Sequence, residues 1–97
     1  MPTYVMLLNW TEQGIGAYRD TVSRADAAAQ ALERLGGRMK EIYWTLGPYD
    51  VVAVVEAPDD ETATAFALAT GAQGSVRSTT MRAFDRDEMQ AIVQKAG

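Results

Sequence analysis

The stretch MKEIYWTLGPYDVVAVVEAP, residues 39–58, decides the fold of this 97-residue chain because it has the pattern of a complete β-hairpin. Two segments rich in β-branched and aromatic residues, Met39–Leu46 and Tyr49–Ala57, flank the turn-forming pair Gly47-Pro48. In a two-residue loop, Pro48 would occupy a position that disfavours proline, so a four-residue loop, residues 46–49, fits the sequence better. The stretch therefore predicts two antiparallel strands joined by a short loop.

The loop length also determines which residues of the two strands share a face. An even-numbered loop gives the facing pairs Thr45 with Asp50, Tyr43 with Val52, and Glu41 with Val54. The other face is apolar and consists of Ile42, Trp44, Leu46, Tyr49, Val51, Ala53 and Val55. We expect helices to cover this apolar face. The assignment depends on the loop length, because a shift of one residue would exchange the faces of one strand.

The residues before the hairpin predict a central strand and a helix. Residues 3–10, TYVMLLNW, are almost continuously apolar, which is typical of a strand in the middle of a sheet. After a polar connection, a helix is expected from about Val22 or Ser23 to Leu35, with Ser23 as its cap and Gly36-Gly37 as its stop. Its apolar stripe consists of Ala25, Ala28, Ala29, Leu32 and Leu35. The small alanines predict close contact between this helix and the sheet.

The residues after the hairpin predict a second helix, a fourth strand and a last helix. The second helix runs from Pro58 to about Thr70, and residues 76–84 form the strand. The last helix begins at Asp85 with the pattern of a capping box. Its expected buried residues are Met89, Ile92 and Val93. The resulting order, β-α-β-β-α-β with a terminal helix, is the ferredoxin-like α+β fold, a four-stranded antiparallel sheet with both helices on one face.

The composition excludes several classes of protein. There is no cysteine and no histidine, which removes thiol nucleophiles, disulfides, Ser/His/Asp triads and Cys/His metal sites. The net charge of −4 argues against nucleic acid as a partner. We expect one domain over residues 1–97 that needs no cofactor and no metal. With no apolar run long enough for a membrane span and no signal-peptide pattern, we also expect a cytoplasmic protein without a membrane partner.

One face of the expected sheet carries no helix. Val52, Val54 and Tyr43 project from this open side, and apolar residues there have to be covered by another subunit or by a ligand. We therefore predict a homodimer, or a higher homo-oligomer, that packs sheet face against sheet face.

The run YWTLGPYDVVAVVEAPDD, residues 43–60, resembles the signature of the GYD-domain family of small bacterial and archaeal proteins. The likeness extends to Thr11–Ile15, Arg24-Ala25, Leu35–Gly37 and Val76–Phe84. The resemblance implies a dimeric, ferredoxin-like sandwich or barrel, and it transfers no catalytic residues. The Gly-Tyr-Asp of the family name corresponds here to Pro48-Tyr49-Asp50, so proline replaces glycine.

Asp50, Arg82 and Tyr43 are the candidates for catalysis. Asp50, beside Thr45, has the position of a general base, although an aspartate near a turn more often accepts bonds from backbone N–H groups. Arg82, on the same side of its strand as Thr80, suits an oxyanion. An ion pair with Glu41, Glu56 or Asp50, within or across subunits, is the plainer explanation. The Tyr43 hydroxyl could orient a ligand or bond across a dimer. The candidate ligand-binding residues are Glu41, Tyr43, Thr45, Asp50, Thr80 and Arg82.

Three functions remain open from the sequence. The first is an oligomeric module that binds a small metabolite or a partner at the open sheet face or a dimer groove. The second is a small cofactor-independent enzyme, similar to a monooxygenase or an isomerase, with Asp50 as base and Arg82 as oxyanion partner. The third is a structural oligomer without a ligand. An enclosed cavity bordered by Tyr43, Asp50 and Arg82 would favour either of the first two.

Overall fold

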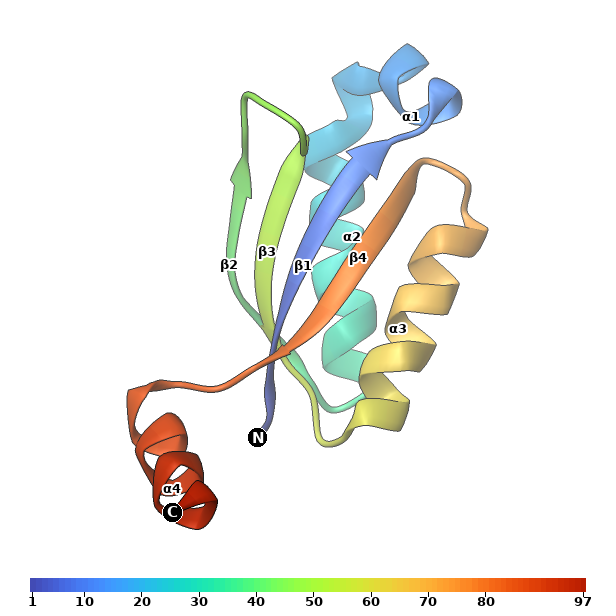
Figure 1. Ribbon diagram of the computed structural model, residues 1–97. Coiled ribbons are helices and arrows are strands. Elements are labelled where there is room, and N and C mark those ends of the chain that lie inside the picture. The colour runs from blue at the N-terminus through green and yellow to red at the C-terminus, as the bar shows by residue number, and fades with distance from the viewer.

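The computed structural model describes residues 1–97 and has two layers, a four-stranded sheet and two long helices on one of its faces (Figure 1). The strands are β1 (Thr3–Trp10), β2 (Arg38–Trp44), β3 (Val51–Glu56) and β4 (Val76–Ala83). All neighbours are antiparallel, and the order across the sheet is β2-β3-β1-β4. The predicted ferredoxin-like α+β order, with a central first strand, is therefore confirmed.

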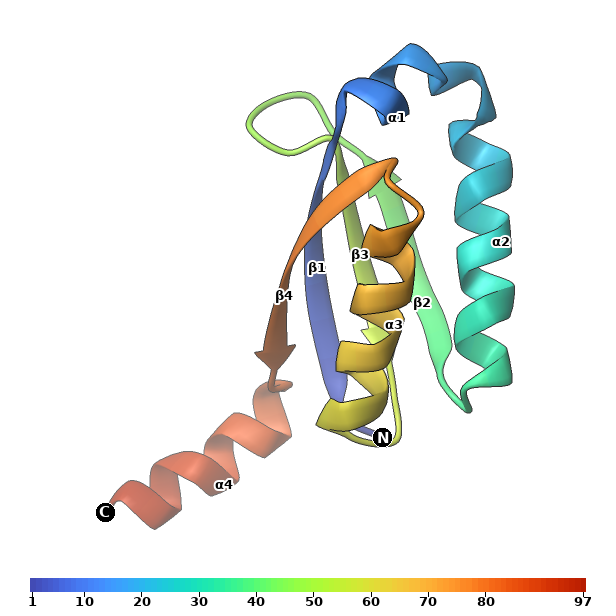
Figure 2. The same cartoon turned by 90° about the vertical axis from the view of Figure 1, so that its right-hand side faces the viewer.

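Both long helices cover the same side of the sheet. Figure 2 shows α2 (Thr21–Arg34) and α3 (Asp60–Ala72) on one side and no helix across the other. We call the uncovered side the open face. At its centre are Val5, Leu7, Val52, Val54 and Met81. None of the helices combines the length and the apolar composition needed to cross a membrane.

The hairpin has the facing that its sequence predicts. Tyr43 lies opposite Val52 and Glu41 opposite Val54, and the Thr45 N–H donates to the Asp50 carbonyl at 2.9 Å. A bulge between Met39 and Glu41 shifts the register near the start of β2. Residues 46–49 lie between the facing residues Thr45 and Asp50, so the expected four-residue loop is confirmed. Leu46 and Tyr49 are therefore loop residues and do not extend the apolar face of the strands. The expectation for these two residues was wrong, and Leu46 is fully exposed.

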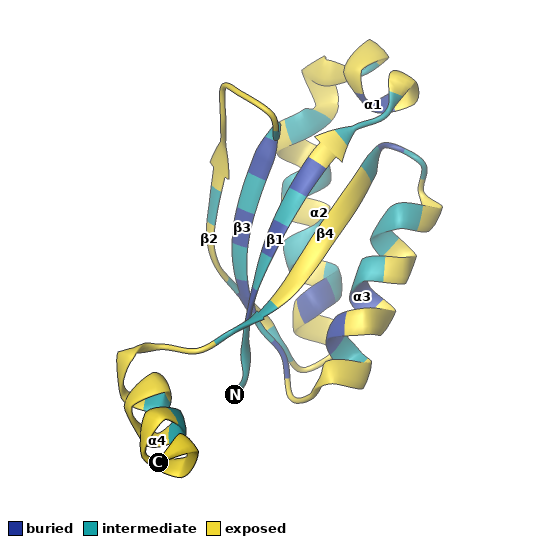
Figure 3. Ribbon diagram, viewed as in Figure 1, coloured by how far each residue is buried: buried dark blue, intermediate teal, exposed yellow.

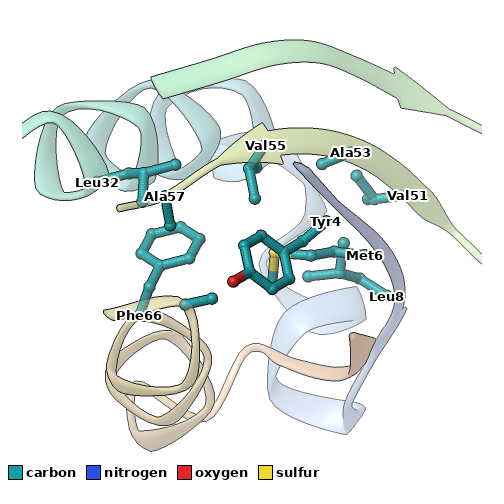
Figure 4. Packing of buried hydrophobic residues seen from close by; sticks show 10 residues of the cluster. Tyr4, Met6, Leu8, Leu32, Val51, Ala53, Val55, Ala57 and Phe66 are labelled. Carbon is teal, nitrogen blue, oxygen red and sulfur yellow. The ribbon is translucent and has the colours of Figure 1, made fainter. Parts of the chain in front are cut away.

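Alternation along the two central strands builds the core. Tyr4, Met6 and Leu8 of β1 are buried towards the helices, whereas Val5 and Leu7 are only half-buried on the open face. The helices add Leu32 and Phe66 to the same cluster (Figure 4). The complete cluster is Tyr4, Met6, Leu8, Leu32, Val51, Ala53, Val55, Ala57, Ala63 and Phe66. The core thus lies entirely on the helix-covered side.

The helix ends agree with the sequence except before α2. Asp59 caps α3, and Asp85 and Glu88 form the predicted capping box of α4 (Arg86–Ala96). The expected polar connection after β1 contains two short helices, α1 (Glu12–Gly16) and η1 (Tyr18–Asp20). Helix α2 therefore begins at Thr21, and Ser23 is not its cap but lies within its first turn.

The last helix does not pack on the sheet. In Figures 1 and 2, α4 projects beyond one end of the sheet, on the side of the open face. The radius of gyration is consequently 14.4 Å, compared with about 12.5 Å for a compact domain of this length. No residue of α4 is buried, so the prediction that Met89, Ile92 and Val93 are buried is wrong for the single chain.

Candidate functional site

The open face has an apolar centre with polar residues at its border. Figure 3 views this face and shows the alternation of buried and half-buried positions along β1 and β3. The half-buried positions include Val5, Leu7, Val52 and Val54, and Met81 on β4 is 43% exposed. At the border, Arg38 of β2 forms an ion pair of 3.2 Å with Glu56 of β3. An apolar centre with a polar border is a composition typical of contact surfaces between proteins.

Glu41 and Tyr43 lie together on the open face, at the outer strand β2. The Tyr43 hydroxyl donates to Glu41 Oε2 at 2.7 Å, and its side chain is 57% exposed. The hydrogen bond to Glu41, together with the negative charge of Glu41, raises the pKa of Tyr43. The hydroxyl proton of Tyr43 is thus committed to Glu41, and the exposed ring is the part of the side chain that another molecule can contact.

Asp50 connects three strands at the end of the hairpin. Its backbone N–H donates to the Leu8 carbonyl of β1, and its backbone carbonyl accepts from Thr45, each at 2.9 Å. Its carboxylate Oδ2 accepts from the Trp10 N–H, also at 2.9 Å. The carboxylate thus acts as a strand carbonyl would, just before β3 begins. This is the structural use of aspartate that the sequence favoured, but the donor belongs to β1 and not to the hairpin turn.

Two further bonds hold the hairpin loop. The Thr45 hydroxyl donates to the Tyr49 carbonyl at 2.6 Å, and the Asn9 amide donates to the Pro48 carbonyl at 2.7 Å. All peptide bonds are trans, and the left-handed turn position is taken by Gly47, with φ at +142°. Pro48 therefore fits the loop without a special conformation, and Leu46 is presented at the surface of a restrained loop.

Thr80 and Arg82 lie on the opposite side of the sheet from Tyr43. In the register between β4 and β1, Thr80 pairs with Met6 and Arg82 with Tyr4, which are both core residues. The open-face residues of β4 are instead Arg77, Thr79, Met81 and Ala83. The expectation of one constellation that contains Tyr43, Asp50 and Arg82 is therefore corrected, because the sheet separates Arg82 from Tyr43.

Arg82 is held by local contacts. Its guanidinium lies 4.5 Å from the ring centre of Phe84, and Nη2 lies 3.7 Å from Glu88 Oε2 on α4. It also donates to the backbone carbonyls of Thr3 and Ala83. The plainer explanation, an ion pair with a carboxylate, agrees with this geometry, but the partner is Glu88. The carboxylates expected from the sequence were Glu41, Glu56 and Asp50.

A polar cleft between α3 and β4 contains the residues that sequence reasoning missed. Tyr4 and Asp60 line this cleft together with Thr80 and Arg82. The Tyr4 hydroxyl donates to Asp60 Oδ1 at 2.5 Å, and burial together with this bond raises the pKa of Tyr4 to about 12. The signal available in the sequence was the two-residue alternation of Tyr4 with Met6 and Leu8, which places Tyr4 on the core side.

The three catalytic candidates from the sequence do not converge on one position. Asp50 is engaged with the backbone of β1, Tyr43 with Glu41, and Arg82 with Glu88 on the other side of the sheet. General acid–base chemistry needs groups that converge on one reacting position. No group of three or more acidic side chains is placed to hold a metal ion. The open face offers apolar area with a polar border instead.

Comparisons with known proteins identify relatives over almost the whole length. The model of the GYD domain family matches residues 4–93. A Thermus thermophilus protein named "Glutamine synthetase and cystathionine beta-lyase binding protein" is 38% identical over 84 residues, covering 86% of this chain and 88% of the relative. The crystal structure of TTHA0845, also from Thermus thermophilus, superposes with a TM-score of 0.56 at 26% identity, covering 88% of this chain and 95% of that one. The chain belongs to the GYD domain family.

Proposed function

We propose that this protein is a cytoplasmic, homodimeric binding module: two copies pack through their open faces, and a protein partner binds at the groove along the edge of the dimer. The observation that carries the proposal is the uncovered apolar centre of the open face. Val5, Leu7, Val52 and Val54 are only half-buried in the single chain. Burial of such a surface contributes about 25 cal/mol for each Å² removed from water, and this gain offsets the freedom that the two chains lose on association.

The polar border of the open face is where a partner protein would bind. Tyr43 combines a large exposed ring with a hydroxyl, and tyrosine is among the residues that contribute most to protein interfaces. The loop that follows Tyr43 presents Leu46 on a backbone restrained by the Asn9–Pro48 bond. The name of the Thermus thermophilus relative, which describes binding to two enzymes, supports a protein as the partner.

The first test is the oligomeric state of the purified chain. We expect light scattering to give a dimer at micromolar concentration, and Val52→Lys to give a monomer, because a lysine at the centre of the interface would be buried without a partner. Val22→Lys is the matched control, since Val22 is 58% exposed on α2. A wild-type monomer, or a Val52→Lys variant that remains dimeric, would contradict the proposed interface.

The second test is binding to glutamine synthetase and cystathionine β-lyase from the same organism as this chain, measured by surface plasmon resonance. Tyr43→Ala is expected to weaken binding at least tenfold, the effect of an interface hot spot. Tyr18→Ala is the control, because Tyr18 is 53% exposed on η1, close to the 57% of Tyr43. Absence of binding to both enzymes would reject them as partners, and a stable dimer without them would favour the structural oligomer.

A further inference from the structure

A cavity lies between α2 and the helix-covered side of the sheet, away from the open face. Its volume is about 120 Å³, and fifteen of its twenty lining residues are hydrophobic. Met6 and Leu8 form its floor on β1, Ala28 lies on α2, and Phe66 on α3. An apolar cavity of about 150 Å³ in a protein interior stays free of water and binds benzene. The space beside α2 is similar in volume and is open to solvent on one side, where Leu35 and Trp44 of its lining are 43% and 40% exposed. It therefore has room for one aromatic ring against its apolar walls.

The sequence of α2 explains why this space exists. Ala25, Ala28 and Ala31 line the cavity, and their methyl groups do not reach far enough to fill the space above β1 and β3. Leu32 is the one fully buried side chain of the helix, and Leu35 is 43% exposed. The alanine stripe thus leaves a gap along the helix in place of the expected close contact with the sheet. An empty gap of this kind lowers the stability of the fold unless a ligand occupies it.

Arg24 is the one charged residue in the cavity lining. Its Nη1 donates to the Ala17 carbonyl at 2.9 Å and its Nη2 to the Gly14 carbonyl at 3.4 Å. These bonds orient the guanidinium but do not neutralise it, because the three ion pairs of the chain involve other arginines. An uncompensated guanidinium beside an apolar cavity suits a carboxylate, which can take two parallel hydrogen bonds.

Both tryptophans of the chain also line the cavity. The Trp44 Nε1–H donates to the Thr21 hydroxyl at 3.0 Å, which joins the end of β2 to the first residue of α2. Trp10 lies at the end of β1 and is half-buried. Indole fluorescence therefore reports directly on this space, and an aromatic ligand would be in contact with aromatic walls.

We propose that the cavity between α2 and the sheet binds a small aromatic carboxylate, with its ring among the apolar side chains and its carboxylate at Arg24. This site lies on the other side of the sheet from the proposed dimer interface, so it is independent of the proposed function. The size of the cavity limits the apolar part of the ligand that enters it to one ring or a short branched chain of equal volume.

Titration with benzoate, benzene and acetate, followed by tryptophan fluorescence, tests the proposal. Benzoate and benzene are expected to give saturable changes, with benzoate the tighter of the two, and acetate is expected to give none. Absence of a saturable change with both ring probes would overturn the proposal. An affinity for benzoate that falls as the protein concentration rises would overturn it as well, because a second copy of the chain would then occupy the cavity.

Two pairs of variants locate the binding. Ala28→Leu fills the cavity and is expected to weaken the binding of benzoate and of benzene at least tenfold. Ala27→Leu, at an exposed position of the same helix, is its matched control.

The second pair tests the charge. Arg24→Gln is expected to weaken the binding of benzoate at least fivefold and that of benzene less than twofold, with Arg34→Gln as control. Equal effects of the two leucine variants, or equal loss of both probes in Arg24→Gln, would overturn the assignment. Circular dichroism checks folding, and Ala31→Val replaces Ala28→Leu if that variant does not fold.

Discussion

The carboxylate of Asp50 is predicted to stabilise the junction of three strands. Replacement by alanine removes the acceptor of the Trp10 N–H, a bond of 2.9 Å at a half-buried position. Hydrogen bonds to charged groups contribute about 1.5–3 kcal/mol, and a donor left without a partner adds to the loss. Asp50→Ala is therefore expected to lower the free energy of unfolding by about 2–3 kcal/mol.

The substitution Asp50→Asn separates the contribution of the hydrogen bond to stability from that of the negative charge. Its amide oxygen has the place of Oδ2 and can accept from Trp10, so Asp50→Asn is expected to cost about 1 kcal/mol, roughly half of the alanine effect or less. Urea unfolding, followed by tryptophan fluorescence and circular dichroism, measures both values. Asp26→Ala, at an exposed position on α2, is the control and is expected to change stability by less than about 0.5 kcal/mol.

Two results would refute this reasoning. If Asp50→Ala unfolds at the same urea concentration as the wild type, the Trp10 bond contributes nothing and the carboxylate is free for another role. If Asp50→Asn lowers the free energy of unfolding as much as Asp50→Ala does, the charge of the carboxylate stabilises the fold and the geometry of its hydrogen bond does not. Either outcome would return Asp50 to the position of a candidate base.

Two further perturbations test the packing around β1. Gly14→Ala is expected to cost about 1–3 kcal/mol, because its Cβ would overlap the Ser75 carbonyl oxygen, whereas Gly16→Ala has open space and no such cost; thermal unfolding compares them. The raised pKa of Tyr4, about 12 against 10 in the unfolded chain, means that the folded state holds this proton longer. The contribution of the Tyr4 hydroxyl to the free energy of unfolding is thus complete below pH 10 and is lost as the pH rises towards 12. In urea unfolding, the difference in stability between the wild type and Tyr4→Phe should therefore shrink over that range. An advantage that stays constant from about pH 8 to 11 would contradict the assignment.

The hairpin was predictable because its information is local. Alternation with a period of two and a count of loop residues are enough to pair Tyr43 with Val52. The capping box of α4 was predictable for the same reason, since Asp85 and Glu88 lie within one helical turn. Leu46 and Tyr49 were misplaced at the point where the regular alternation ends.

The side of the sheet on which Arg82 lies could not be read from its own strand. Both alternating sets of β4 contain polar residues and one arginine, so neither identifies the core side. The choice is made by pairing with β1, which is far away in the sequence and brings Arg82 opposite Tyr4. Asp60 reaches Tyr4 through the same kind of long-range contact.

The amino-acid sequence by itself determined the order of the elements, the α+β fold, the family and the facing of the hairpin, because these follow from periodicity, capping and turn residues within short segments. Only the tertiary structure decided that Arg82 and Tyr43 lie on opposite sides of the sheet, that α4 leaves its apolar residues exposed, and that the alanines of α2 border a cavity. Those features depend on the register between distant strands and on the volume left between packed elements, which no local pattern encodes.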